Sequence, residues 1–224
     1  MIWLMVGLVL FLGAHSVRIF ADEWRTQTRA AWGELPFKGA YTVVSVLGFA
    51  AIIVGYGEAR LQPWVLWTPP IATRHVSILL MLFASVLLVA AYVPRNHIKL
   101  RLKHPMVLSV KVWALSHLLA NGNLADVILF GSFLTWAVFN FRAARARDRL
   151  SELPANAAED AAEDAAEDAA EDAAQVAEIA ALGSTTATSP NTLATLVAVG
   201  VGCAFWALFT FVLHAKWIGV APLS

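Results

Sequence analysis

Residues 104–122 read HPMVLSVKVWALSHLLANG, and this stretch has the length and the apolar character of a transmembrane helix. It also contains His104, Lys111 and His117. An ionisable side chain in the bilayer costs about 3 kcal/mol on insertion scales, and such side chains usually mark functional sites. The stretch therefore predicts a membrane helix that has a functional role.

Helical geometry separates the two histidines of this stretch. The thirteen residues from His104 to His117 correspond to a rise of about 20 Å and a rotation of about 140°. The two imidazoles cannot bind one metal ion together on an unbroken helix, so each is expected to find partners on other helices. Lys111 has three open roles. The first, which we favour, is a pair with a carboxylate such as Asp126. The other two are the binding of an anionic group and a hydrogen bond to a helix carbonyl.

The composition is that of an integral membrane protein. The 224 residues are 59% hydrophobic and 14% charged, which excludes a nucleic-acid-binding protein. The single cysteine, Cys203, lies in an apolar run and is expected to serve packing. The N-terminal apolar segment lacks a basic leader and a small-residue cleavage site, so we expect it to be a retained span.

Six segments are long and apolar enough to cross a bilayer, which needs roughly 17 to 25 residues. We therefore predict an all-α integral membrane bundle of about six transmembrane helices. The expected spans are 2–20, 39–56, 76–93, 104–122, 124–141 and 193–213.

The basic residues predict the orientation of these helices. Of the sixteen Lys and Arg residues, twelve lie in or beside the odd-numbered loops, three lie in the even-numbered loops or the C-terminal tail, and Lys111 lies within a span. Because loops rich in Lys and Arg stay on the cytoplasmic side, we expect the odd loops in the cytoplasm and both termini outside.

The composition changes abruptly at the fifth loop, which divides the chain into three parts. Residues 1–142 form a five-helix membrane core, 143–190 a cytoplasmic linker, and 191–224 the sixth helix with a short outer tail. Four copies of Ala-Ala-Glu-Asp fill 157–172, and their glutamates repel one another at a spacing of four. The linker is expected to be a partly helical or disordered spacer; an acidic partner-binding tail is the alternative.

The predicted topology gives each histidine an approximate depth. His15 and His104 lie in the inner half of the membrane, and His75, His117 and His214 lie in the outer half. Helical bundles build cofactor sites from side chains on facing helices, and imidazole is a common axial ligand of haem. A b-type haem held by two histidines would need no cysteine motif.

The first span adds a charged residue near one of these histidines. Arg18 lies one turn from His15 on the same helical stripe. It is placed to meet a haem propionate, or, as a structural alternative, to pair with Asp22 at the membrane border.

Five blocks of the sequence together resemble the NnrU family of bacterial membrane proteins. The most specific block contains HPM, WA and HLLANG in sequence, and the resemblance leaves out only about 143–190, where the acidic repeat departs from the family pattern. The blocks are 7–20, 47–60, 66–81, 88–138 and 211–220.

This resemblance implies a bacterial inner-membrane protein associated with denitrification, with links to nitrite and nitric oxide reduction. The family is also similar to 15-cis-zeta-carotene isomerase, a membrane enzyme with a histidine-ligated haem b. Its histidine motifs match His15, His75, His104 and His117, and the resemblance implies His15 and His117 as the ligand pair. Predicted depth instead favours His15 with His104 or His75 with His117, so His75 and His104 remain alternates or substrate-side groups.

Three functions remain open on this basis. The first is a haem b-binding accessory protein or sensor of nitrogen-oxide metabolism, with nitric oxide as the small-molecule partner. The second is a haem-dependent cis–trans isomerase of a polyene or related lipid, for which the sequence specifies no catalytic residue. The third is a non-catalytic partner of another membrane protein, with Ala198 and Gly202 as a small-residue helix contact.

Overall fold

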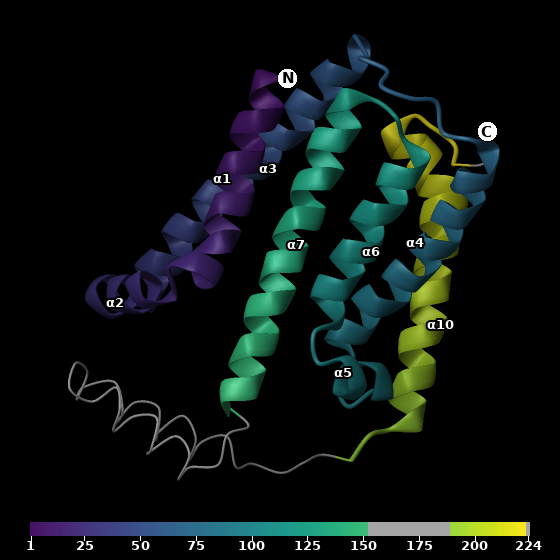
Figure 1. Cartoon of the computed structure of the whole chain (residues 1–224). Helices are drawn as coiled ribbons and strands as arrows, with labels where there is room; N and C mark the ends of the chain where they lie inside the picture. The colour runs from purple at the N-terminus through teal and green to yellow at the C-terminus, as the bar shows by residue number, and fades with distance from the viewer. Residues whose placement is uncertain (152–188, 223–224) are drawn as a thin grey trace.

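The computed structural model describes residues 1–151 and 189–222. Its regular structure is helical, with long helices side by side and both chain ends near the same end of the bundle (Figure 1). Among the described residues, five helices are long and apolar enough to cross a membrane, and a sixth, Pro105–Ala120, is shorter. The prediction of a membrane bundle of about six helices is confirmed. Most of the expected acidic linker, residues 152–188, lies outside the described residues.

Several long helices extend beyond the apolar segments that predicted them, whereas Ile2–Phe20 matches its segment. Helix α7 shows this best, because it continues through an Arg- and Ala-rich stretch to Ser151, and these are good helix formers. The last span begins as α10 and continues as a π-helix, η1. The bounds are α1 Ile2–Phe20, α3 Glu34–Leu61, α4 Ile71–Tyr92, α6 Pro105–Ala120, α7 Leu124–Ser151, α10 Thr192–Leu208 and η1 Phe209–Ile218.

The helices form two groups joined by α7. Helices α1 and α3 pack along each other, and α4 packs against both α6 and α10. Helix α7 contacts α6 on one side and α1 on the other, and it lies between the two groups in Figure 1. The apolar core under this joint includes Leu4, Leu8, Ala114, Leu129 and Phe130.

Glycines allow α1 and α3 to approach each other closely. A Cβ atom built on Gly55 would lie 2.0 Å from the backbone nitrogen of Leu4, and one built on Gly7 would lie 2.5 Å from that of Ile52. Neither position has room for a side chain. Close backbone contact through small residues is a main source of helix association in membranes.

The last span is held against α4 by the small residues that the sequence suggested. Ala198 is fully buried, and a Cβ on Gly202 would lie 2.6 Å from the Cα of Val86. Trp206 donates from its indole nitrogen to the carbonyl of Ile78 at 3.0 Å. Ala198 and Gly202 therefore make a small-residue helix contact within this chain, and a contact with another membrane protein stays a prediction.

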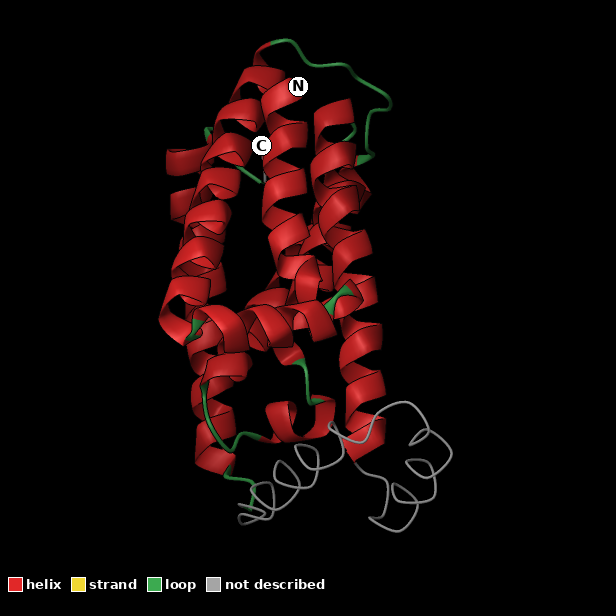
Figure 2. Cartoon of the chain, turned by 90° about the vertical axis from the view of Figure 1, so that its left-hand side faces the viewer, coloured by secondary structure: helices red, strands yellow, loops and turns green. Residues whose placement is uncertain are grey.

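Two loops contain short helices where the sequence suggested only irregular chain. Helix α2, Asp22–Trp32, runs crosswise to the long helices (Figure 2), and α5 spans His97–Leu102. Two acidic residues in the first turn of α2 and a Gln27 to Glu23 bond support it locally. Trp24 and Trp32 are more than half exposed, as expected of interfacial anchors.

The α1 and α3 contact yields a test with an internal control. Gly55→Ala should lower the free energy of unfolding by about 1 to 3 kcal/mol, because the new methyl group overpacks the helix crossing. Gly57 lies one half-turn further along α3, where an added Cβ meets no atom within 4 Å. Gly57→Ala should be neutral or stabilising by up to about 1 kcal/mol. Thermal unfolding in detergent measures both, and equal effects would contradict the described crossing.

Candidate functional site

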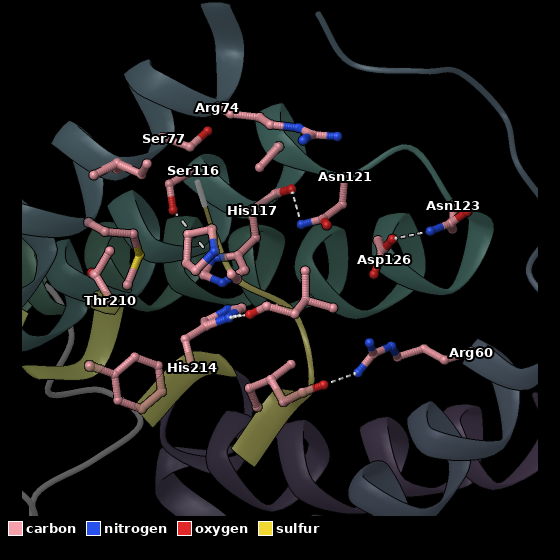
Figure 3. A pocket seen from close by; sticks show the side chains of 18 of the residues that line it. Arg60, Arg74, Ser77, Ser116, His117, Asn121, Asn123, Asp126, Thr210 and His214 are labelled. Atoms are coloured by element: carbon pink, nitrogen blue, oxygen red, sulfur yellow. Dashed lines mark hydrogen bonds between the residues drawn. The ribbon is translucent and has the colours of Figure 1, made fainter. Parts of the chain in front are cut away.

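A cavity of about 350 Å³ lies at the end of the bundle that carries the chain termini. Its walls come from α3, α4, α6, α7, η1 and the C-terminal segment. Figure 3 shows polar side chains pointing into it from several of these elements. The polar side chains that line it are Tyr56, Arg60, Arg74, Ser77, Ser116, His117, Asn121, Asn123, Asp126, Thr210 and His214.

Two connections dock on each other beside the cavity. The backbone nitrogens of Leu66 and Trp67 both donate to the carbonyl of Gly122, and the nitrogen of Leu124 donates to the carbonyl of Trp64. A Cβ on Gly122 would lie 1.8 Å from the carbonyl oxygen of Trp67, so the position requires glycine. This contact holds together the ends of α3, α4, α6 and α7 that carry much of the cavity wall.

His117 lines the cavity from the last turn of α6. Its Nδ1 donates to the carbonyl of Trp113 at 2.9 Å, and its ring stacks on Phe130 with centroids 4.4 Å apart. Because a carbonyl only accepts, the proton of the neutral ring is on Nδ1, and Nε2 keeps its lone pair. His117 is therefore an oriented imidazole ligand with one nitrogen free to bind.

His214 points into the same cavity from the opposite wall, as Figure 3 shows. Its Nδ1 donates to the carbonyl of Val220 at 2.6 Å, which leaves Nε2 as the basic nitrogen here as well. Thr210, His214 and Ile218 line the cavity at a spacing of four along the wide turns of η1. π-Helical turns are rare and often mark functional sites.

A buried carboxylate completes the polar wall. Asp126 is 3% exposed, and it accepts a hydrogen bond from the Tyr56 hydroxyl on α3 and another from the Asn123 side chain at 3.0 Å. The expected pairing of Lys111 with this carboxylate is wrong, because Lys111 instead places its Nζ over the ring of Phe141, 4.0 Å from the centroid. A cation–π contact thus satisfies the lysine.

His15 lies apart from this cavity. Its Nδ1 donates to the carbonyl of Phe11 at 2.7 Å, and its ring faces Tyr41 and Trp136 at centroid distances of 5.3 and 6.2 Å. A chain of ring contacts runs from His15 to His117. It passes through Phe11, Phe133 and Trp113. The structure thus gives no direct contact between the two histidines, and their role as a ligand pair stays a prediction.

The two alternate histidines occupy different settings. His75 is exposed on α4 and donates to the carbonyl of Ile71. His104, just before α6, places its Nε2 2.9 Å from a carboxylate oxygen of Asp148 on α7. That contact joins two helices at the end of the bundle opposite the cavity. His104 is therefore engaged in a helix contact.

The expected pairing of Arg18 with Asp22 is not formed among the described residues. Asp22 accepts instead from Arg25, one turn further along α2, at 3.2 Å. The short helix α2 explains the change, because it turns Asp22 toward its own (i, i+3) partner. The proposed contact of Arg18 with a cofactor stays a prediction.

The sequence pointed to His117 as a site residue but not to its surroundings. The predicted depth of His214 equals that of His117, but the sequence alone does not indicate His214 as a ligand. The sequence also does not indicate Arg60 and Arg74 as parts of a site. No group of three or more His, Cys, Asp or Glu side chains in the described parts of the chain could hold a metal ion. His117 and His214 both line the cavity, and histidine is a common ligand of haem iron.

The fold and the cavity define a multi-pass helical membrane protein with a polar site near one end of its bundle. Residues 3–222 match the NnrU protein family, and the chain belongs to that family. No curated protein and no solved structure matches the sequence.

The contact between Tyr56 and Asp126 yields a second prediction. In a double-mutant cycle, Tyr56→Phe and Asp126→Asn should show an interaction free energy of about 0.6 to 1.7 kcal/mol, the range of hydrogen bonds between membrane helices. Denaturation in mixed micelles measures each variant. Tyr92→Phe is the control, since Tyr92 is 70% exposed at the far end of α4 and should give no coupling with Asp126→Asn. A Tyr56 coupling near zero would contradict the described bond.

Proposed function

We propose that this member of the NnrU family is a haem b-binding protein of the bacterial inner membrane, active in nitrogen-oxide metabolism. The observation that carries the proposal is the convergence of His117 and His214 on one cavity. The role in nitrogen-oxide metabolism is supported by the family resemblance alone.

The donor chemistry of the cavity fits such a cofactor. His117 and His214 each keep Nε2 as a basic nitrogen, because Nδ1 of each donates to a backbone carbonyl. These carbonyl bonds fix the ring orientation and raise the basicity of the free nitrogen, as carbonyl partners do for metal-binding histidines in general. His117 and His214 would therefore hold the iron.

The other cavity residues set the environment of the site. Ile78, Met81 and Phe209 provide apolar walls, and such walls control solvent access and redox potential. When bound, haem b would supply an iron centre that takes up nitric oxide or transfers electrons. The role of the protein would be to orient the two imidazoles and to limit the contact of the cofactor with water.

The charge distribution supports a cytoplasmic location for the end opposite the cavity. Residues 18–38, 95–103 and 142–149, which form this end of the bundle, contain twelve basic residues, and loops rich in Lys and Arg stay in the cytoplasm. On this basis both termini and the cavity face the outside of the inner membrane.

The proposal predicts a haem b spectrum for the purified protein. Oxidised and reduced absorption spectra in detergent, with a pyridine extract to identify the haem, should show close to one haem b per chain. His117→Ala should lose most of it, because the substitution removes a ligand nitrogen.

His97→Ala provides the matched control. His97 is exposed at the start of α5, away from the cavity, and its substitution should leave the haem content unchanged. A folded wild-type protein that takes up no haem b, even on reconstitution, would contradict the proposal.

A further inference from the structure

The cavity has an uneven distribution of charge. Arg60 at the end of α3 and Arg74 at the start of α4 both line it. Asp126 is the one acidic side chain among the described residues of its lining, and it is 3% exposed with both carboxylate oxygens in hydrogen bonds. A bound molecule therefore meets the two cations more readily than the anion.

The Arg60 side chain is held in place with donors to spare. Its Nη1 donates to the carbonyl of Ile218 at 2.8 Å, and its guanidinium carbon lies 5.9 Å from the centre of the Tyr56 ring. A guanidinium has five N–H donors in a planar fork that matches a carboxylate. One donor holds the end of η1, and the guanidinium lies at the cavity wall, as Figure 3 shows.

The rest of the cavity suits an apolar body. Ile78, Met81, Phe209 and Ile218 face it from α4 and η1. Ligand sites typically combine such apolar lining with a few polar groups that fix orientation. Apolar walls with two arginines select a molecule that has an apolar body and acidic groups.

We propose that Arg60 and Arg74 form an acid-binding end of this cavity and that the ligand is an amphiphilic carboxylate. The inference rests on the proposed function, since haem b is a dicarboxylate of this kind. It concerns different residues from the iron ligands and can be tested without iron.

The experiment compares iron-free protoporphyrin IX with its dimethyl ester. The two probes share one ring and differ in their acidic groups, and neither needs an axial ligand. Fluorescence titrations of the full-length protein in nanodiscs would give the ratio of ester to acid dissociation constants. The variants are Arg60→Gln, Arg74→Gln and, as a control, Arg101→Gln on the exposed face of α5.

The wild type and Arg101→Gln should share one ratio in favour of the acid. Arg60→Gln and Arg74→Gln should each reduce that ratio by about tenfold, as expected for the loss of a charge-assisted hydrogen bond. Arg60→Lys keeps the charge and should retain part of the preference. Because the ratio is taken within each variant, a partial loss of folded protein does not change it.

A competition arm distinguishes a porphyrin from a lipid acid as the source of the carboxylate. Displacement of the bound porphyrin by oleate but not by methyl oleate would support the acid-binding end and identify a fatty acid as its ligand. Displacement by neither would support it with a porphyrin as ligand.

An unchanged ratio in both cavity variants would overturn the inference. A wild-type protein that shows no acid preference but has an intact haem b spectrum would count against the acid-binding end alone. An acid preference without any haem uptake would count against the proposed function alone.

Discussion

The docking of two connections on each other, through the carbonyl of Gly122, is the contact on which the arrangement of the cavity depends. The chain between α3 and α4 donates two backbone hydrogen bonds to that carbonyl, and Leu124 returns one. Backbone polar groups that are shielded from water need hydrogen-bond partners within the protein, and the two connections provide such partners for each other. Tyr56, Arg60 and Arg74 are brought beside His117 because their helices end or begin at this contact.

The sequence predicted the membrane bundle well because hydropathy and charge suffice for it. The six spans follow from apolar length, and the small-residue helix contact at Gly202 follows from residue size. The helical conformation of α2 was missed because its apolar content is low, and its support comes from local side-chain pairs. The extension of α7 to Ser151 was missed because a charged helix end leaves no trace in hydropathy.

The site was predictable only in part. The predicted depth groups His117 with His75 and His214. The family resemblance instead implies His15 as the partner of His117. Nothing in the sequence indicates that the last span widens into a π-helix, which carries His214 into the cavity. The partners of Asp126 and Lys111 likewise depend on which helices are neighbours. Tertiary packing decides which helices are neighbours, and the spacing of residues within one helix gives no information about those neighbours.

The central claim is that His117 and His214 form one ligand pair. The most direct test is electron paramagnetic resonance of the ferric, haem-loaded protein, comparing wild type with His214→Ala and His15→Ala. We expect a low-spin signal of two imidazole ligands in the wild type, the same signal in His15→Ala, and a high-spin signal in His214→Ala. A high-spin signal in His15→Ala, with the low-spin signal retained in His214→Ala, would contradict the pair and support His15 with His117.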